Sequence, residues 1–205
     1  MDESLALLAL SRISQIKKIQ KKWIVDNFES VADLFKGKVR APEGTDRYFR
    51  PLRQLGSLEG ERDRIQKGGV SIVTLRDSDY PDRLRQIPDA PVVIYKKGTI
   101  SLCAPTFSIV GARKATFEGI ALAERIGETL SSLGVTIVSG LARGIDASAH
   151  RGALQGRGRT IGVLGCGIDI CYPAENLFLF EAMSKEGAII TEYAPGERPL
   201  KHHFP

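Results

Sequence analysis

Three short segments decide the fold: FSIV-GARKAT at residues 107–116, VTIV-SGLARGID at residues 135–146, and TIGVL-GCGID at residues 160–169. In each segment an apolar run ends in a loop of small residues. A strand, a glycine loop and a helix that repeat at similar intervals are typical of parallel βαβ units. We therefore predict an α/β domain with a Rossmann-like parallel sheet and helices on both faces.

The three loops should lie together, because open α/β sheets bind ligands outside the carboxyl ends of their strands. A glycine loop that enters a helix presents unpaired main-chain N–H groups at the positive end of the helix dipole, where a phosphate fits. Arginine can add two parallel charge-assisted hydrogen bonds to phosphate oxygens. The alternative is that the glycines only turn tight corners. The phosphate-binding candidates are Gly111, Arg113, Ser139, Gly140, Arg143, Gly165 and Gly167.

The composition is that of an ordinary globular protein. The chain has 205 residues, 42% hydrophobic and 26% charged, which is enough for one sizeable domain and a small one. The net charge of +5 is uneven, since residues 1–70 hold 14 Lys/Arg against 10 Asp/Glu and residues 71–205 hold 15 against 14. An anion site in the second part must therefore be local, built from a few placed residues and main-chain amides.

Several other classes of protein are excluded by the sequence. No apolar run approaches the roughly 18 residues of a membrane helix, and the start MDESLALLAL lacks the basic lead of a secretory signal. We therefore expect a cytoplasmic protein without membrane contact. The three cysteines, Cys103, Cys166 and Cys171, form no C-x-x-C pair and are odd in number, which argues against a disulfide framework. We expect no metal and no cofactor, and we interpret Cys166 and Cys171 as small buried hydrophobic residues.

An all-helical module is predicted ahead of the sheet. Apolar residues recur at helical spacing over residues 4–36, and Asp2 or Ser4 could cap the first helix. We place a helical domain at residues 1–68 and the Rossmann-like domain at residues 69–205. One face of the module is basic, through Lys17, Lys18, Lys21 and Lys22. We interpret this face as solvated rather than as a DNA contact.

The remaining elements follow from the same patterns. We predict strands at residues 70–75, 92–95 and 188–192, and helices at residues 59–67, 116–133, 145–154 and 176–185. The helix at residues 116–133 is expected to bury one side of large and small apolar residues. That side consists of Ile120, Leu122, Ala123, Ile126 and Leu130.

Asp146 and His150 stand four residues apart on one face of the helix after the second loop. They could form a catalytic Asp–His pair, but no Ser or Cys nucleophile in the sequence is evidently paired with the histidine. We prefer a structural interpretation, in which Asp146 satisfies donors at the helix start and His150 is its partner in locking the loop. Asp169 is interpreted in the same way, as a carboxylate that fixes the third loop.

These motifs together resemble the DprA/Smf family of DNA-processing proteins. The resemblance is carried by SIVGAR at 108–113, IVSGLARGIDASAH at 137–150, GVLGCGID at 162–169, and the pairs Tyr172-Pro173 and Phe204-Pro205. It covers about residues 70–205, and its second motif is long and specific. The helical N-terminus resembles the small sterile-alpha-motif-like (SAM-like) domain that many members carry.

The resemblance implies a non-enzymatic domain that binds single-stranded DNA without much sequence preference. Members of the family act in DNA recombination: they protect incoming DNA during natural transformation, in competence, and load the recombinase RecA onto it. On this chain Arg113 matches an arginine that faces the DNA backbone, and Ser139 and Gly140 match a phosphate-facing turn. Lys201 and Phe204 match a lysine and a phenylalanine on which a base stacks.

Family members continue past the Phe-Pro pair with an Arg-Asn-Arg segment and further sheet and helices. From the resemblance we therefore expect that this chain lacks the C-terminal part of its Rossmann-like domain. We also expect a homodimer for a full-length protein. The contacts with RecA and with the second subunit would lie in that C-terminal part.

Two families of enzymes remain as alternatives. A nucleotide phosphoribohydrolase of the lysine-decarboxylase-like family has a related Rossmann architecture, but it needs a Pro-Gly-Gly-x-Gly-Thr run followed by a glutamate, which the sequence lacks. A dinucleotide oxidoreductase needs G-x-G-x-x-G, and Ile170 stands where the third glycine after Gly165 and Gly167 would be. Binding, rather than catalysis, is therefore the function that we predict.

Overall fold

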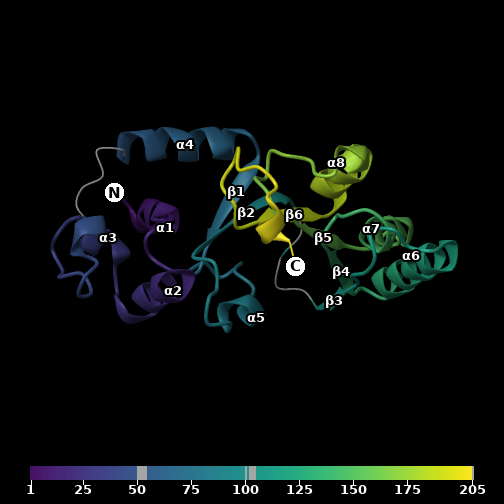
Figure 1. Ribbon diagram of the computed structural model, residues 1–205, viewed down its shortest axis with the longest axis horizontal. Helices are drawn as coiled ribbons and strands as arrows, with labels where there is room; N and C mark the ends of the chain where they lie inside the picture. The colour runs from purple at the N-terminus through teal and green to yellow at the C-terminus, as the bar shows by residue number, and fades with distance from the viewer. Residues whose placement is uncertain (50–54, 100, 102–104, 205) are drawn as a thin grey trace. The chain divides into compact units, whose positions relative to one another are not determined.

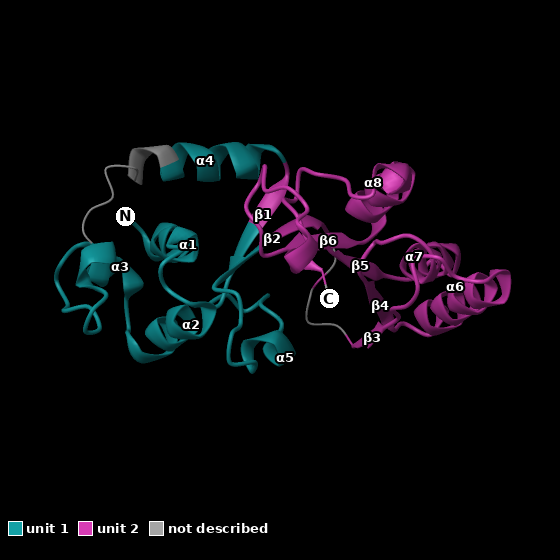
Figure 2. Ribbon diagram, viewed as in Figure 1, with its two compact units in different colours: residues 1–68, 72–94 teal, residues 69–71, 95–205 magenta. Residues whose placement is uncertain are grey.

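A computed structural model describes residues 1–49, 55–99, 101 and 105–204, of which residues 55–57 are described by their main chain only. The chain forms two compact units, residues 1–68 with 72–94 and residues 69–71 with 95–205 (Figure 2). Cys103 and Pro205, which the sequence singles out, lie outside the described residues. Among the described residues, every helix is too short or too polar to span a bilayer.

The first unit is mainly helical. Its helices are α1 (Glu3–Arg12), α2 (Lys18–Asn27), α3 (Val31–Phe35), α4 (Leu55–Lys67) and α5 (Asp82–Arg85), with the 3-10 turn η1 (Asp46–Tyr48). The Asp2 carboxylate caps α1, as predicted, by accepting a hydrogen bond from the N–H of Leu5 at 2.8 Å. Every residue from Leu5 to Leu10 is at most 1% exposed. Because α1 is apolar and buried on all sides, it forms the core of this unit.

The second unit contains the predicted βαβ rhythm (Figure 1). Strands β3 (Thr106–Ser108), β4 (Thr136–Ser139), β5 (Thr160–Val163) and β6 (Ala188–Thr191) run parallel. The sheet is mixed rather than purely parallel, because β2 (Val93–Gly98) pairs antiparallel with β6. With β1 (Val70–Thr74), the strand order is β1-β2-β6-β5-β4-β3. An antiparallel neighbour needs no crossover helix, so the βαβ pattern in the sequence does not reveal it.

Helices α6 (Phe117–Ser132), α7 (Ile145–Gln155) and α8 (Leu177–Glu186) connect the four parallel strands. Since the sheet advances from β3 to β6 in one direction, crossovers of the same hand place all three helices on one face. Helix α7 contacts both of the others, as expected for a single layer. In the described part of this unit, these three helices therefore form one layer against the sheet.

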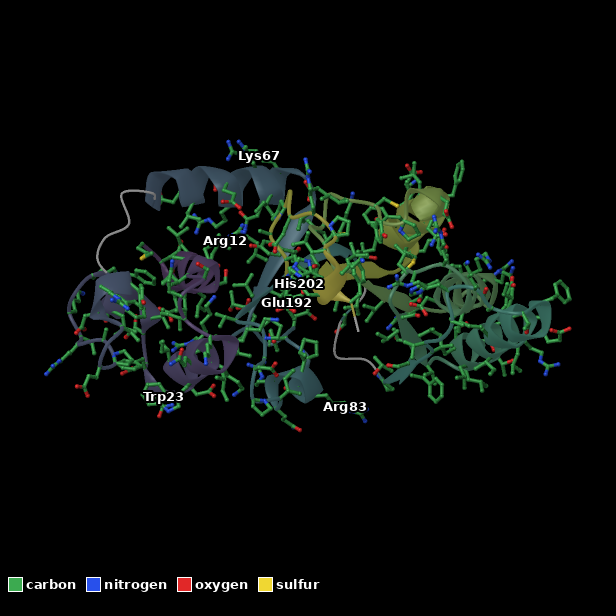
Figure 3. The ribbon with its side chains drawn as sticks, in the orientation of Figure 1. Arg12, Trp23, Lys67, Arg83, Glu192 and His202 are labelled. Carbon is green, nitrogen blue, oxygen red and sulfur yellow. The ribbon has the colours of Figure 1, made fainter. Side chains whose placement is uncertain are left out.

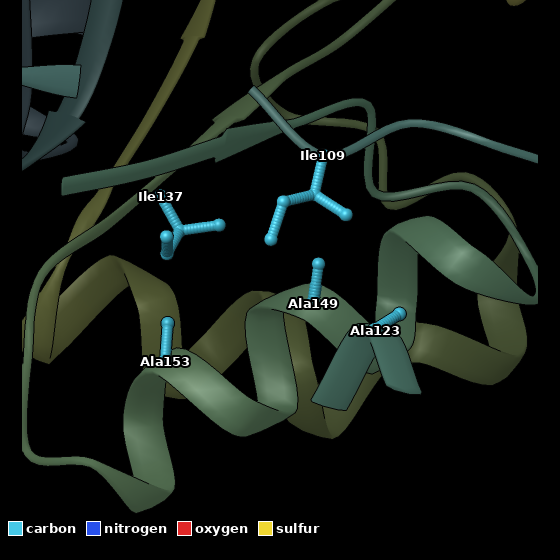
Figure 4. Close-up of a cluster of buried hydrophobic side chains, with 5 residues drawn as sticks. All are labelled: Ile109, Ala123, Ile137, Ala149 and Ala153. Atoms are coloured by element: carbon cyan, nitrogen blue, oxygen red, sulfur yellow. The ribbon is translucent and has the colours of Figure 1, made fainter. Parts of the chain in front are cut away.

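A compact core lies between this helix layer and the strands. Figure 4 shows its buried side chains, which are Ile109, Ala123, Ile137, Ala149 and Ala153. Three of the five are alanines, so the helices lie close to the sheet and close to each other. The strands thereby hold the loops at their carboxyl ends on a rigid base.

Small residues bring α6 and α7 into contact main chain to main chain. A Cβ atom at Gly152 would lie 1.9 Å from the carbonyl oxygen of Glu124, so that only glycine fits there without a shift. The buried residues of α6 are Ala123, Gly127 and Ser131. The predicted buried side of α6 is wrong in part, because Leu122 and Ile126 are exposed. A close helix pair selects small side chains at four-residue spacing, and it turns larger ones outward.

Candidate nucleic-acid interface

Asp146 ties the first loop to the second. Its carboxylate accepts hydrogen bonds from the main-chain N–H of Gly111 at 3.3 Å and of Gly140 at 3.1 Å. The Ser139 hydroxyl adds a second link by donating to the carbonyl of Ile109 at 2.5 Å. Both side chains are buried. Asp146 and Ser139 therefore fix the relative position of the two loops, in agreement with the structural interpretation of Asp146.

His150 is not the partner of Asp146 that we predict. Its Nδ1 lies 2.6 Å from the hydroxyl of Thr160, and this hydroxyl donates to the carbonyl of Ile137 at 2.9 Å. The hydroxyl must therefore accept the proton on Nδ1. Burial lowers the pKa of His150 to about 3, so the imidazole is neutral at pH 7. Its position beneath β4 and β5 fixes the sheet rather than the loop.

The first two loops present open main-chain donors. Within the described part of the chain, the N–H groups of Arg113, Ala142 and Arg143 have no protein acceptor, and these residues are exposed or half-buried. Gly144 makes this arrangement possible, because it has a φ of +72° and a Cβ atom there would lie 2.3 Å from the carbonyl of Ala112. Helix α7 begins directly after these groups. Unpaired amides at the start of a helix are the chemistry that binds phosphate.

Arg113 and Phe204 meet beside these donors. The guanidinium carbon of Arg113 lies 5.5 Å from the centroid of the Phe204 ring, within the range of a cation–π contact. The ring of Tyr172, 44% exposed, lies 5.7 Å from that of Phe204. A positive charge thus lies on one aromatic ring, and a second ring beside it is partly open to solvent.

The glycines of the third loop make room for protein atoms. A Cβ atom at Gly165 would lie 2.7 Å from the ring of Phe204, and one at Gly167 would lie 2.5 Å from the carbonyl of Ala194. Gly165 therefore leaves room for the Phe204 ring. Gly167 leaves room for the main chain at Ala194 and Gly196, which precedes Phe204 in the sequence. The close approach predicted at this loop is made by the protein's own chain.

The segment that ends in Phe204 is held by three further contacts. The Asp169 carboxylate accepts from the N–H of Gly196 at 2.8 and 3.0 Å, which agrees with its predicted role. His203 Nδ1 lies 3.0 Å from the carbonyl of Gly165, and its ring stacks on Tyr193 at 4.0 Å. Lys201 is exposed at the start of the turn η3 (Lys201–His203). The neighbouring His202, labelled in Figure 3, is exposed as well.

Arg143 is engaged by a carboxylate that the sequence does not connect to it. Its Nε and Nη2 donate to the two carboxylate oxygens of Glu175, each at 2.7 Å. These hydrogen bonds raise the pKa of Arg143 and lower the pKa of Glu175. The next residue, Asn176, donates its side-chain amide to the carbonyl of Leu141 at 2.9 Å. The segment before α8 is thus attached to the second loop.

The cysteines do not contribute to this chemistry. Cys166 is buried, as predicted, and burial raises the pKa of its thiol to about 11. Cys171 is half-buried rather than buried. Within the residues that the structure describes, no three His, Cys, Asp or Glu side chains are grouped closely enough to hold a metal ion.

The fold and the loops define a class of protein: an α/β domain with glycine loops at the carboxyl ends of its parallel strands and an arginine–aromatic contact beside them. The family model described as DNA recombination-mediator protein A matches residues 71–205. The chain belongs to this family.

Individual relatives agree with this assignment. Protein Smf of Synechocystis is 34% identical over 97% of this chain and 53% of its own length. The crystal structure of DNA processing protein A from Streptococcus pneumoniae matches with a TM-score of 0.77 at 31% identity, over 98% of this chain and 71% of that chain. DNA processing protein A from Helicobacter pylori, described for its single-stranded DNA binding mode, matches with a TM-score of 0.59 at 29% identity, over 65% and 61% of the two chains. The chain spans about half the length of the curated relatives that it matches.

Proposed function

We propose that this chain binds single-stranded DNA at the carboxyl ends of its parallel strands and acts in DNA recombination. The observation that carries the proposal is the contact of Arg113 with Phe204 beside the open amides of the second loop. A strand of DNA offers phosphates and bases, and this edge offers hydrogen-bond donors, a positive charge and aromatic rings. The single-stranded DNA binding described for the Helicobacter pylori relative supports it.

In the binding reaction the backbone phosphates lie on the loop amides and on Arg113. One base stacks on Phe204, while Lys201 provides a positive charge for the backbone. The N–H groups of Gly111 and Gly140 donate to Asp146, so these two glycines hold the loops in position and leave the phosphates to other loop amides. Since each of these contacts is to a phosphate or to the face of a base, binding should depend little on sequence.

The wider role belongs to the same proposal. As a family member, the protein would protect incoming DNA in natural transformation, help to load RecA, and form a homodimer in a full-length protein. It would act in the cytoplasm, without catalysing a reaction. We also keep the domain division, with a SAM-like helical domain at residues 1–68 and a Rossmann-like domain at residues 69–205, as a proposal.

The test is a titration of fluorescently labelled oligo-dT, followed by anisotropy at two salt concentrations, with a duplex of equal length as the control. We expect the protein to bind the single strand more tightly than the duplex, and the affinity to fall as salt rises, because phosphate contacts release counterions. Equal affinity for the duplex, or no binding at low salt, would contradict the proposed function.

A further inference from the structure

The contact between Arg143 and Glu175 has the geometry of an arginine–phosphate contact. The Nε and Nη2 groups of the guanidinium each donate to one carboxylate oxygen at 2.7 Å. Arginine presents the same pair of parallel donors to two oxygens of a phosphate. Glu175 therefore occupies the face of Arg143 that a phosphate would need.

This ion pair is exposed to solvent. The side chains of Arg143 and Glu175 are 60% and 54% exposed, and exposed ion pairs contribute little to the stability of a fold. The attachment of this segment to the second loop does not depend on the pair, because Asn176 donates to the carbonyl of Leu141 at 2.9 Å. The Glu175 carboxylate can thus leave Arg143 while the segment stays in place.

The pair is connected through the chain to the proposed DNA contacts. Glu175, the partner of Arg143, follows Tyr172 by three residues in the chain. Tyr172 lies 5.7 Å from Phe204, and Phe204 lies 5.5 Å from Arg113. Arg113 thus lies on one of these rings, and among the described residues the ion pair with a carboxylate is made by Arg143.

We propose that Glu175 is an internal competitor for a phosphate site on Arg143. A single strand that reaches beyond Tyr172 exchanges the carboxylate for a backbone phosphate, and Glu175 then turns to water. The charge of Glu175 thereby sets how many phosphates the protein engages and at what salt concentration it releases the strand. The inference rests on the proposed function, because it assigns a regulating residue to the same site.

The test compares Glu175→Gln with wild type in oligo-dT titrations between 50 and 200 mM monovalent salt. The substitution removes the competing charge and keeps the length of the side chain. We expect the slope of log K against log[salt] to steepen by about 0.7, the value for one more single-strand phosphate, and the affinity at 50 mM salt to rise by about 8-fold. The double variant Glu175→Gln/Arg143→Gln should lose this gain.

Glu186→Gln is the matched control. It makes the same change in net charge at an exposed glutamate at the end of α8, outside the ion pair. An equal gain from Glu186→Gln would overturn the inference, because net charge alone would then explain it. Thermal melting of the variants adds a structural readout: if Glu175 serves only to hold the segment, Glu175→Gln lowers both the melting temperature and the affinity.

The outcomes separate this inference from the proposed function. If wild type and Glu175→Gln bind oligo-dT alike and Arg113→Ala weakens both, the competitor role is overturned and the proposed function stands. If neither wild type nor Glu175→Gln binds oligo-dT at low salt, both the competitor role and the proposed function are contradicted. Tighter, more salt-sensitive binding by Glu175→Gln alone supports the competitor.

Discussion

Two regions of the second unit, the contact between α6 and α7 and the loops at the carboxyl ends of the strands, differ in how their main-chain groups are satisfied. Between α6 and α7 the chains meet so closely that a Cβ atom at Gly152 would be 1.9 Å from a carbonyl oxygen, and no space is left. At the carboxyl ends of the strands, Asp146 satisfies two loop amides, while those of Ala142 and Arg143 have no acceptor among the described residues. Small residues thus allow close packing in both regions, and at the strand ends they leave some loop amides without a partner among the described residues.

The largest expected effect is on the packing side. Gly152→Ala should destabilise the protein by about 3 kcal/mol or more, because the new methyl group must push α7 away from the main chain of α6. Urea unfolding measures the change. Gly119→Ala in α6 is the control: its Cβ atom would meet neighbours at an ordinary 3.5 Å, so we expect a neutral or slightly stabilising effect. Equal effects of the two substitutions would show that the helix contact is not tight.

The second largest expected effect is a pH dependence of stability that comes from the buried His150. The folded-state pKa of His150 is about 3 against an ordinary 6.5, so the unfolded state binds more protons between these values. Stability should therefore be complete above pH 6.5 and fall as pH decreases, by about 2.7 kcal/mol at pH 4.5 from this residue. Urea unfolding between pH 4.5 and 7 measures this dependence.

His150→Asn is the informative variant, since it keeps a donor toward Thr160 and cannot titrate. We expect it to be less stable at pH 7 but to lose this part of the pH dependence. His202→Asn, at an exposed position, should keep the dependence of wild type. A His150→Asn protein with an unchanged pH dependence would assign the effect to other groups.

How much of this the sequence could predict depends on the range of each contact. The strands, the loops and α7 could be predicted, because each follows from a local pattern of apolar residues and glycines. The predicted buried side of α6 is wrong in part, because hydrophobic periodicity favours Leu122 and Ile126 over Gly127. Gly127 is buried because it has no Cβ atom, which would lie 2.5 Å from the carbonyl oxygen of Ala149. The partner of His150, on β5, depends on strand pairing that helical spacing does not reveal.

The candidate site divides in the same way. Gly111, Arg113 and Gly140 could be placed from the loop pattern, and Phe204 from the family resemblance alone. Glu175 is 32 residues from Arg143 in the sequence, and no local pattern links them. That each candidate residue binds DNA stays a prediction. Substitutions at Phe204 and Arg113 test it.

Phe204→Ala should weaken oligo-dT binding by about 1–3 kcal/mol, the usual cost of losing one stacked base. Its salt dependence should stay close to that of wild type, because no phosphate contact is removed. Anisotropy titrations at several salt concentrations measure both quantities. Phe204→Tyr is the control, since it keeps an aromatic face. A reduced salt slope with unchanged affinity at low salt would show that Phe204 is not a stacking platform.

Arg113→Ala has the smallest expected effect at moderate salt. It should lower the salt slope by about 0.7, the value of one single-strand phosphate, and weaken all sequences alike. Arg113→Lys should keep the slope, because it keeps the charge while losing the paired donors. The same titrations with mixed-sequence oligonucleotides measure this. Wild-type affinity and slope in Arg113→Ala would remove this residue from the site.

The most direct test of the comparison is an NMR titration of the ¹⁵N-labelled protein with oligo-dT. The largest amide shift changes should fall on Arg113, on Ala142 and Arg143 and around Phe204, while the amides between α6 and α7 stay unchanged. Shift changes concentrated on Lys17 to Lys22 of the helical unit, with the loops unaffected, would contradict the assignment of the DNA site to the ends of the parallel strands.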